Sequence, residues 1–140
     1  MKLLDANLLL YAYDPTSEHH RIARAWLEAT LSGPDSVSMS WIAILAFLRI
    51  STNRHALRMP LAEAAARVRE WLSVPNVSIL HPGERFWGIL EKLLRDGQCH
   101  GNLIMDAQLA ALAIEHGATL CTNDRDFTRF AGLKYLNPLN

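Results

Sequence analysis

Short apolar runs alternate along the chain with longer segments in which apolar residues recur every three or four positions. The short runs are typical of buried strands and lie at residues 2–4, 37–39, 77–80, 118–121 and 133–136. The longer segments are typical of amphipathic helices and lie at residues 6–13, 18–31, 41–51, 60–72, 84–95 and 101–116, with one helical turn at 127–130. Strands that alternate with helices favour a mostly parallel sheet covered on both faces. The pattern therefore predicts an α/β fold with three layers, α/β/α.

Residues at the helix ends support these boundaries. Ser17 and Ser40 precede two of the helices and are expected to serve as N-caps. Pro60 occupies a first-turn position that suits proline. Gly117 follows the last long helix, where a left-handed residue commonly ends a helix.

The spacing of apolar residues also predicts which helix faces are buried. The expected inward residues are Ile22, Ala23, Trp26, Leu27 and Thr30 in 18–31, Leu61, Ala65, Val68 and Leu72 in 60–72, and Phe86, Ile89, Leu90, Leu93 and Leu94 in 84–95. The four tryptophans, at positions 26, 41, 71 and 87, fall within helical patterns, and we expect them in the core rather than on an RNA-stacking surface.

Length and composition limit the classes of protein to consider. A chain of 140 residues is expected to form a single domain over 1–140, and 50% hydrophobic residues exclude a disordered protein. The longest apolar run, 41–48, is much shorter than the ~20 residues of a membrane span. Cys99 and Cys121 lack metal-ligand spacing, and Asp5 interrupts any signal-peptide core, so we expect a reduced cytoplasmic protein without membrane contact.

Four aspartates fall where this architecture would bring them together. Asp5 ends the first strand, Asp124 and Asp126 follow the fourth strand, and Asp106 lies on a helix stripe that continues through Leu109, Ala110 and Ala113. The carboxyl ends of parallel strands border the crevice where ligands bind. Each aspartate has a structural alternative: Asp5 and Asp124 could cap the helices that follow them, Asp106 could serve the helix dipole, and Asp126 could be solvated.

Converging carboxylates repel each other unless a cation holds them. A set of oxygen ligands without Cys or His favours Mg²⁺ or Mn²⁺ over zinc. The net charge is +0, so contacts with a polyanion must come from a local basic patch or from a dimer. Candidate phosphate contacts are Arg49, Arg54, His55, Arg58 and Arg125, although the segment 54–58 could equally be an ordinary solvated loop.

Four motifs in this order resemble the PIN-domain ribonucleases, above all the VapC toxins of bacterial toxin–antitoxin pairs. They are LLDANLLLYAY, WIAILAFLRISTN, GNLIMDAQLAALAIEHGATL and CTNDRDF, and together they cover essentially the whole chain. The resemblance implies a PIN-like domain and a metal-dependent endoribonuclease that cleaves structured RNA such as tRNA or rRNA loops. It also implies a homodimer that a small VapB-like antitoxin silences.

By the same resemblance, Asp5, Asp106 and Asp124 would be catalytic, and these three with Asp126 would bind Mg²⁺ or Mn²⁺. Asn7, Asn102 and Asn123 would support them. One position departs from the family pattern. The family commonly has a glutamate where this chain has Ala46, and no neighbouring acid replaces it. This departure favours an alternative function, a catalytically weak or inactive PIN fold that binds RNA or a protein.

Overall fold

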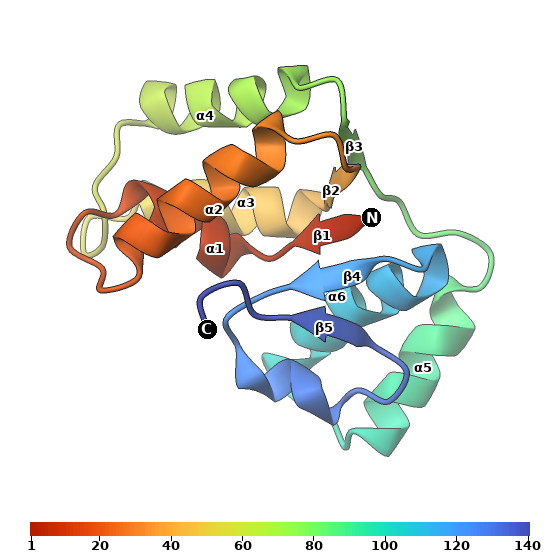
Figure 1. Cartoon of the computed structure of the whole chain (residues 1–140). Helices are drawn as coiled ribbons and strands as arrows, with labels where there is room; N and C mark the ends of the chain where they lie inside the picture. Colours follow the sequence, from red (N-terminus) through yellow and green to blue (C-terminus); the bar gives the residue numbers. More distant parts are fainter.

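The computed structural model describes all 140 residues and contains one parallel sheet of five short strands. The strands are β1 (Lys2–Leu4), β2 (Val37–Met39), β3 (Val77–Ile79), β4 (Thr119–Cys121) and β5 (Lys134–Leu136), and their spatial order is β3-β2-β1-β4-β5 (Figure 1). In the central strand, Leu3 is in register with Ser38 of β2 and Leu120 of β4. The expected α/β fold is confirmed, and every strand pair is parallel.

Helices cover both faces of the sheet. On one face lie α1 (Ala6–Tyr13), α2 (His20–Ser32), α3 (Trp41–Ser51) and α4 (Leu61–Ser73). On the other lie α5 (Phe86–Asp96), α6 (Leu103–His116) and the 3₁₀ helix η1 (Arg125–Arg129). Successive strand residues point to opposite faces, so Leu4 belongs to the first core and Leu3 to the second. No helix is long and apolar enough to span a bilayer.

The direction of the connections reverses at the centre of the sheet. From β1 the chain proceeds outward to β2 and β3 on the α1–α4 side, then returns along α5 and α6 to β4, which pairs with the other edge of β1. The loops after β1 and β4 therefore diverge, and ligands bind at such a point in open α/β sheets. Asp5 directly follows β1 and Thr122 directly follows β4.

Most predicted boundaries agree with the structure, but the start of α2 does not. The helix begins at His20 with His19 as N-cap, whereas the Ser17 hydroxyl accepts a hydrogen bond from the His19 N–H within the preceding turn. Ser40 caps α3 as expected, accepting from the Ala43 N–H at 3.1 Å. Gly117 adopts the left-handed conformation expected of a C-terminal glycine, with φ 66°.

The predicted faces of two helices need correction. In α4, Leu61 and Leu72 are exposed, and the buried side chains are Ala64, Val68 and Trp71. Trp71 sets this orientation because its ring packs on Phe47 and its Nε1–H donates to the Tyr13 hydroxyl at 3.1 Å. In α2, Ile22 is exposed while Ala23, Leu27 and Thr30 are buried as expected.

Two of the four tryptophans lie outside the core, contrary to prediction. Trp71 is buried and Trp26 packs at the edge of the first core, but Trp41 is 46% exposed and Trp87 is 61% exposed. Both belong to helices with more apolar residues than one buried face can hold. The inward side of α5 is confirmed: Leu93 is buried, and Phe86, Ile89, Leu90 and Leu94 pack against the second core.

Candidate active site

Asp5 stands at the junction of β1 and α1 with both carboxylate oxygens engaged. Its Oδ1 accepts from the Ala6 N–H at 2.7 Å, so it does cap α1, and its Oδ2 accepts from the Thr122 hydroxyl at 2.7 Å. Its own N–H donates to the Cys121 carbonyl at 3.0 Å. Strand pairing and helix capping thus fix this carboxylate at the carboxyl end of the sheet.

Thr122 connects the two loops that diverge from the sheet. Its side chain is fully buried, and its oxygen accepts from the Asp124 N–H at 3.0 Å and from Asn7 Nδ2 at 3.2 Å. Because both N–H groups donate to this oxygen, the single hydroxyl proton is directed to Asp5. The hydroxyl group therefore sets the spacing between Asp5 and the loop that carries Asp124.

Three more carboxylates gather beside this junction. Single oxygens of Asp106, Asp124 and Asp126 lie within 4.8 Å of one another. Asp106 comes from the first turn of α6, while Asp124 caps η1 by accepting from the Asp126 N–H at 2.9 Å. Asp5 is not part of this group of three. The structure therefore gathers three of the four predicted aspartates in one cluster and places Asp5 at the end of β1.

The charges of the four aspartates interact. The pKa of Asp106 is raised to about 6, chiefly by burial and also by repulsion from Asp124, Asp5 and Asp126, while Arg129 opposes the shift. Burial also raises the pKa of Asp5, an effect that the hydrogen bonds from Thr122 and Ala6 oppose and Asp124 reinforces. Without a cation, this arrangement favours a proton on the cluster.

The side chains present fit a hard divalent cation. The trio offers oxygen ligands only, and the mutual repulsion that raises the Asp106 pKa is what a bound cation would relieve. Near this group, Asn7 Oδ1 is a buried oxygen that accepts no hydrogen bond from the protein, while Nδ2 of the same amide donates to Thr122. Such a donor set suits Mg²⁺ or Mn²⁺.

The other predicted site residues lie on or next to α3, α6 and η1. Asn102 is the N-cap residue of α6 without a capping side-chain bond, and Asn123 Oδ1 accepts from Asn137 Nδ2 at 3.0 Å. Arg125 is exposed at the start of η1, directly after Asp124. Arg49 lies on α3, and Arg54 and Arg58 lie in the exposed loop that follows it.

Ala46 is half-buried on α3 and faces a groove of about 660 Å³. Ile42, Leu45, Arg49 and Met105 also line this groove. None of the four aspartates does, but Met105 precedes Asp106 in the first turn of α6. The groove therefore borders the first turn of α6 but does not include the acidic cluster.

The sequence did not reveal two residues that act on the aspartates. Thr122 carries a weak signal, a hydroxyl residue directly after a buried strand and two positions before an aspartate. Arg129 is the basic group whose charge lowers the Asp106 pKa, and its Nη1 donates to the Gly97 carbonyl at 3.3 Å. Its signal is the helical spacing from Asp126, which places both side chains on one short helix.

Comparison with known proteins agrees with this geometry. The family model of the PIN domain matches residues 2–133. Ribonuclease VapC37 of Mycobacterium tuberculosis is 42% identical over 140 residues, covering 99% of this chain and 97% of the relative. Ribonuclease VapC33 of the same species is 43% identical over 141 residues, covering 99% of both. The chain is a PIN-domain protein of the VapC family.

Solved structures share the PIN fold at lower identity. VapBC2 from Rickettsia felis, bound to a promoter DNA fragment, gives a TM-score of 0.71 at 20% identity and covers 97% of each chain. VapBC-1 from nontypeable Haemophilus influenzae gives a TM-score of 0.67 at 24% identity, covering 99% of this chain and 98% of the other. The architecture of this chain is therefore that of the PIN domain.

Proposed function

We propose that this PIN domain is a Mg²⁺- or Mn²⁺-dependent endoribonuclease toxin. The observation that carries the proposal is the gathering of Asp106, Asp124 and Asp126 within 4.8 Å, with Asp5 held beside them at the end of β1. The VapC relatives at 42% and 43% identity, named as ribonucleases, support RNA as the substrate.

The site residues would have two roles: some would bind the cation, and others would position the attacking water and the RNA. A bound Mg²⁺ or Mn²⁺ supplies a water of lowered pKa and neutralises charge that develops on the scissile phosphate. Asp106, Asp124 and Asp126 would hold the cation, and Asp5, fixed by Ala6 and Thr122, would orient the attacking water. Arg125 and Arg129 on η1 would contact phosphates adjacent to the cleaved bond.

The RNA would be bound as a loop or single strand, because only unpaired bases can be splayed into such a crevice. VapC20 of Mycobacterium tuberculosis, described as a toxin that cleaves the sarcin–ricin loop, shares the fold with a TM-score of 0.66 and 20% identity. A structured loop of tRNA or rRNA is therefore the substrate class to test first.

The toxin would be controlled by a VapB-like antitoxin, since structures of toxin–antitoxin complexes share this fold. An Arg side chain of the antitoxin would take the place of the cation's charge against Asp5 and Asp124. Co-expression tests this mechanism: rescue of growth should require the basic residues of the antitoxin, and rescue that persists after their removal would exclude it.

One observation favours the second candidate function, a PIN fold that binds RNA without cleaving it efficiently. Ala46 supplies no carboxylate at a position where the family commonly has a glutamate. In that case RNA would bind in the presence of the divalent cation and remain intact.

Cleavage of tRNA and rRNA fragments by the purified protein, with and without Mg²⁺ or Mn²⁺, separates the two functions. Replacement of Asp106 by Asn keeps the size and removes a charged ligand, so it should reduce turnover at least ~100-fold, as the loss of a major electrostatic stabiliser does. Asp35→Asn is the control, because Asp35 is an exposed carboxylate before β2. Equal cleavage by Asp106→Asn and the parent would refute the assignment.

A further inference from the structure

A further candidate binding surface lies on α1, one helical turn beyond the junction of Asp5 and Thr122. Asn7 Nδ2 donates to the Thr122 oxygen at 3.2 Å, and the Thr122 hydroxyl donates to Asp5, so Asn7 belongs to the site. Tyr11 follows Asn7 by four positions, which places both side chains on one face of the helix. The helical rise separates them by ~6 Å along the axis, a length that one nucleotide can span.

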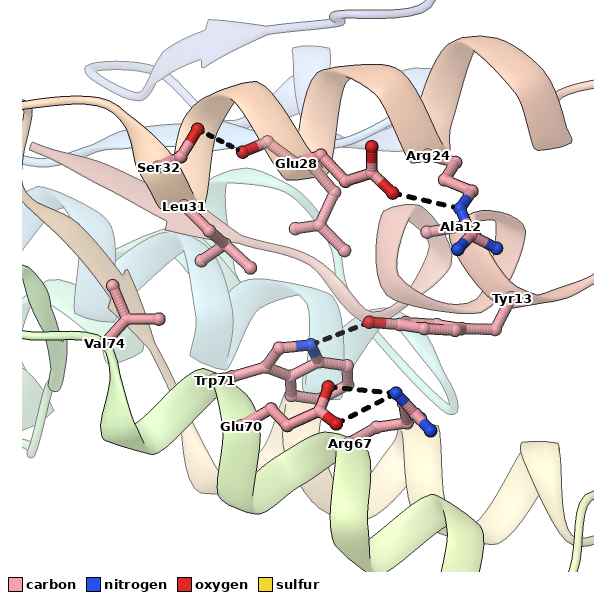
Figure 2. Close-up of a pocket in the computed structure, with 11 residues that line it drawn as sticks. Ala12, Tyr13, Arg24, Glu28, Leu31, Ser32, Arg67, Glu70, Trp71 and Val74 are labelled. Atoms are coloured by element: carbon pink, nitrogen blue, oxygen red, sulfur yellow. Dashed lines mark hydrogen bonds and ion pairs between the residues drawn. The ribbon is translucent and has the colours of Figure 1, made fainter.

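Tyr11 forms an aromatic pair with the imidazole of His19. The two ring centroids are 4.9 Å apart, and the ring planes are tilted by 46°. Both side chains are half-buried, so part of each ring remains open to solvent. Tyr13, two positions later, points toward α4, where its hydroxyl accepts from Trp71 Nε1 at 3.1 Å (Figure 2). The Tyr11 hydroxyl, in contrast, makes no hydrogen bond within the protein, and only the carbonyl of this residue contacts a side chain.

The turn between α1 and α2 fixes this aromatic pair. The Ser17 N–H donates to the Asp14 carbonyl at 3.1 Å, and the Ser17 hydroxyl accepts from the His19 N–H at 3.1 Å. His20 Nδ1 lies 2.9 Å from the Tyr11 carbonyl, which ties the start of α2 to the last turn of α1. Rings that are already held in position lose little conformational entropy when a ligand binds to them.

The charges around the rings favour an uncharged ligand group over a phosphate. The segment 5–20 contains no Lys or Arg. Glu18 Oε1 lies 3.5 Å from His19 Nε2, so a carboxylate stands beside the aromatic pair and would repel a phosphate. The planar face of a nucleobase carries no net charge, and unpaired bases stack on the rings of Tyr and His in many RNA complexes.

We propose that Tyr11 and His19 form a nucleobase subsite, on which a base adjacent to the scissile phosphate stacks. The free Tyr11 hydroxyl contacts the edge of that base or its ribose. The inference rests on the proposed ribonuclease function, because the aspartates define where the phosphate lies. A base that is paired within a duplex cannot reach the rings, so the subsite selects loops and single strands.

Photo-crosslinking tests the contact directly. The probe is a pool of short single-stranded RNAs of random sequence in which 4-thiouridine replaces uridine. The full-length Asp106→Asn variant is irradiated with this pool in Mg²⁺, because slow turnover keeps the RNA intact. Peptide mapping by mass spectrometry should place crosslinks on Tyr11 or His19. Crosslinks confined to other segments of the chain would overturn the proposal.

The affinity of the same protein for one crosslinked RNA then tests the stacking. Adding Tyr11→Leu removes the ring and should weaken binding ~10-fold, the usual effect of losing one stacked base, whereas Tyr11→Phe keeps the ring and should retain most of the affinity. Trp87→Leu is the matched control, because Trp87 is 61% exposed on α5 and should not contribute. An abasic nucleotide at the crosslinked position should bind the protein with and without Tyr11→Leu equally, because the stack is absent in both cases.

The outcomes distinguish the subsite from the catalytic assignment. If Tyr11 only packs α1 against α2, Tyr11→Leu should lower the affinity for intact and abasic RNA alike, and this result would overturn the proposal. Unchanged affinity for the intact RNA in Tyr11→Leu would also overturn it. Metal-dependent cleavage by the parent in either case would leave the ribonuclease function standing without the subsite. A parent that neither binds nor cleaves RNA would refute the ribonuclease function, and the subsite with it.

Discussion

At Asp106, four charged groups act on one carboxyl group. Repulsion from Asp124, Asp5 and Asp126 adds to the effect of burial, and only Arg129 opposes them. The folded protein therefore holds a proton on this residue at a pH where the unfolded chain has released it. This difference makes the stability of the metal-free protein depend on pH.

We predict that the metal-free protein loses stability as the pH rises from about 4 to about 6. The Asp106 pKa is about 6 in the folded protein, whereas an unperturbed aspartate has a pKa of 3.8, so the stabilising contribution of the proton is complete below the lower value and lost above the higher one. Since Asp106 is only half-buried and water screens it, we expect a loss of about 1 kcal/mol.

Urea unfolding in the presence of a chelator, at pH 4.5 and pH 7, measures this loss. Asp106→Asn should be less sensitive to pH because the substituted amide does not titrate over this range. Added Mn²⁺ should stabilise the parent at pH 7, since a ligand that binds only the folded state shifts the equilibrium toward it. An identical pH dependence in Asp106→Asn and the parent would mean that this residue does not carry the effect.

Thr122 allows a second prediction at the residue scale. Thr122→Val keeps the shape but leaves the Asp5 Oδ2, the Asp124 N–H and the Asn7 amide without their shared partner. We expect a loss of about 1–3 kcal/mol in unfolding free energy, the usual cost of leaving buried polar groups unpaired. We also expect reduced turnover, because Asp5 is no longer held.

Thr122→Ser is the matched control, because it retains the hydroxyl. Urea unfolding and RNA cleavage should both return toward the parent values in this variant. If Thr122→Val and Thr122→Ser are equally impaired, the methyl group and not the hydroxyl group is what matters at this position.

The aspartates could be found from the sequence because each follows from a local rule. Asp5 directly follows one buried strand, and Asp124 lies in the loop after another. Asp106 lies on a helix stripe with Leu109 and Ala110. Thr122 and Arg129 could not be found in this way. The direction of the Thr122 proton depends on donors from two loops at once, and the effect of Arg129 depends on how η1 packs against α6.

At the scale of helices, periodicity predicted the elements better than their orientation. In α4 the apolar positions run around most of the helix, so spacing alone fits a face through Leu61 and Leu72 as well as one through Ala64 and Val68. The choice is made by Trp71, which packs against Phe47 and Tyr13 from other helices. That contact depends on the tertiary structure, and a local pattern does not contain it.

The α3 helix carries Ala46, where the resemblance to the family leads us to expect a glutamate. Ala46→Glu places a carboxylate at a half-buried position of the groove that Met105 also lines. We predict that the variant is destabilised in chelator, because a buried charge without a partner is unfavourable, and that it recovers when Mn²⁺ is added. Cleavage should then reach its maximum at a lower metal concentration than in the parent.

Thermal melts with and without Mn²⁺, together with cleavage at increasing metal concentration, measure both effects. Ala46→Gln provides a neutral side chain of the same length and should show neither the recovery nor the shift. A Glu variant that melts at the same temperature in both conditions, with unchanged cleavage, would mean that this side of α3 does not reach the cluster.

At the scale of the whole molecule, the net charge of +0 leaves the monomer without a strong field to attract RNA. The basic side chains Arg49, Arg54 and Arg58 lie on α3 and the following loop, away from the η1 arginines in the sequence. Three exposed apolar side chains, Leu45, Leu61 and Met105, line one groove beside Arg49, and Trp41 on α3 and Ile104 on α6 are exposed as well. Exposed apolar residues that gather in this way mark an interaction surface.

We therefore predict a symmetric homodimer that pairs this surface with its copy and brings two sets of basic residues together. Two-fold dimers are the commonest oligomers and use the same patch on both subunits. Leu45 is 58% exposed and lines the groove with Ile42 and Met105, so Leu45→Glu would place two like charges at the interface.

Sedimentation should show a dimer for the parent at micromolar concentration and a monomer for Leu45→Glu. Ile22→Glu, a charge on an equally apolar but separate exposed site on α2, should remain dimeric. This surface would be excluded if the parent were monomeric or if both variants dissociated alike. Loss of RNA affinity in Leu45→Glu but not in Ile22→Glu would show that the paired basic residues bind the substrate.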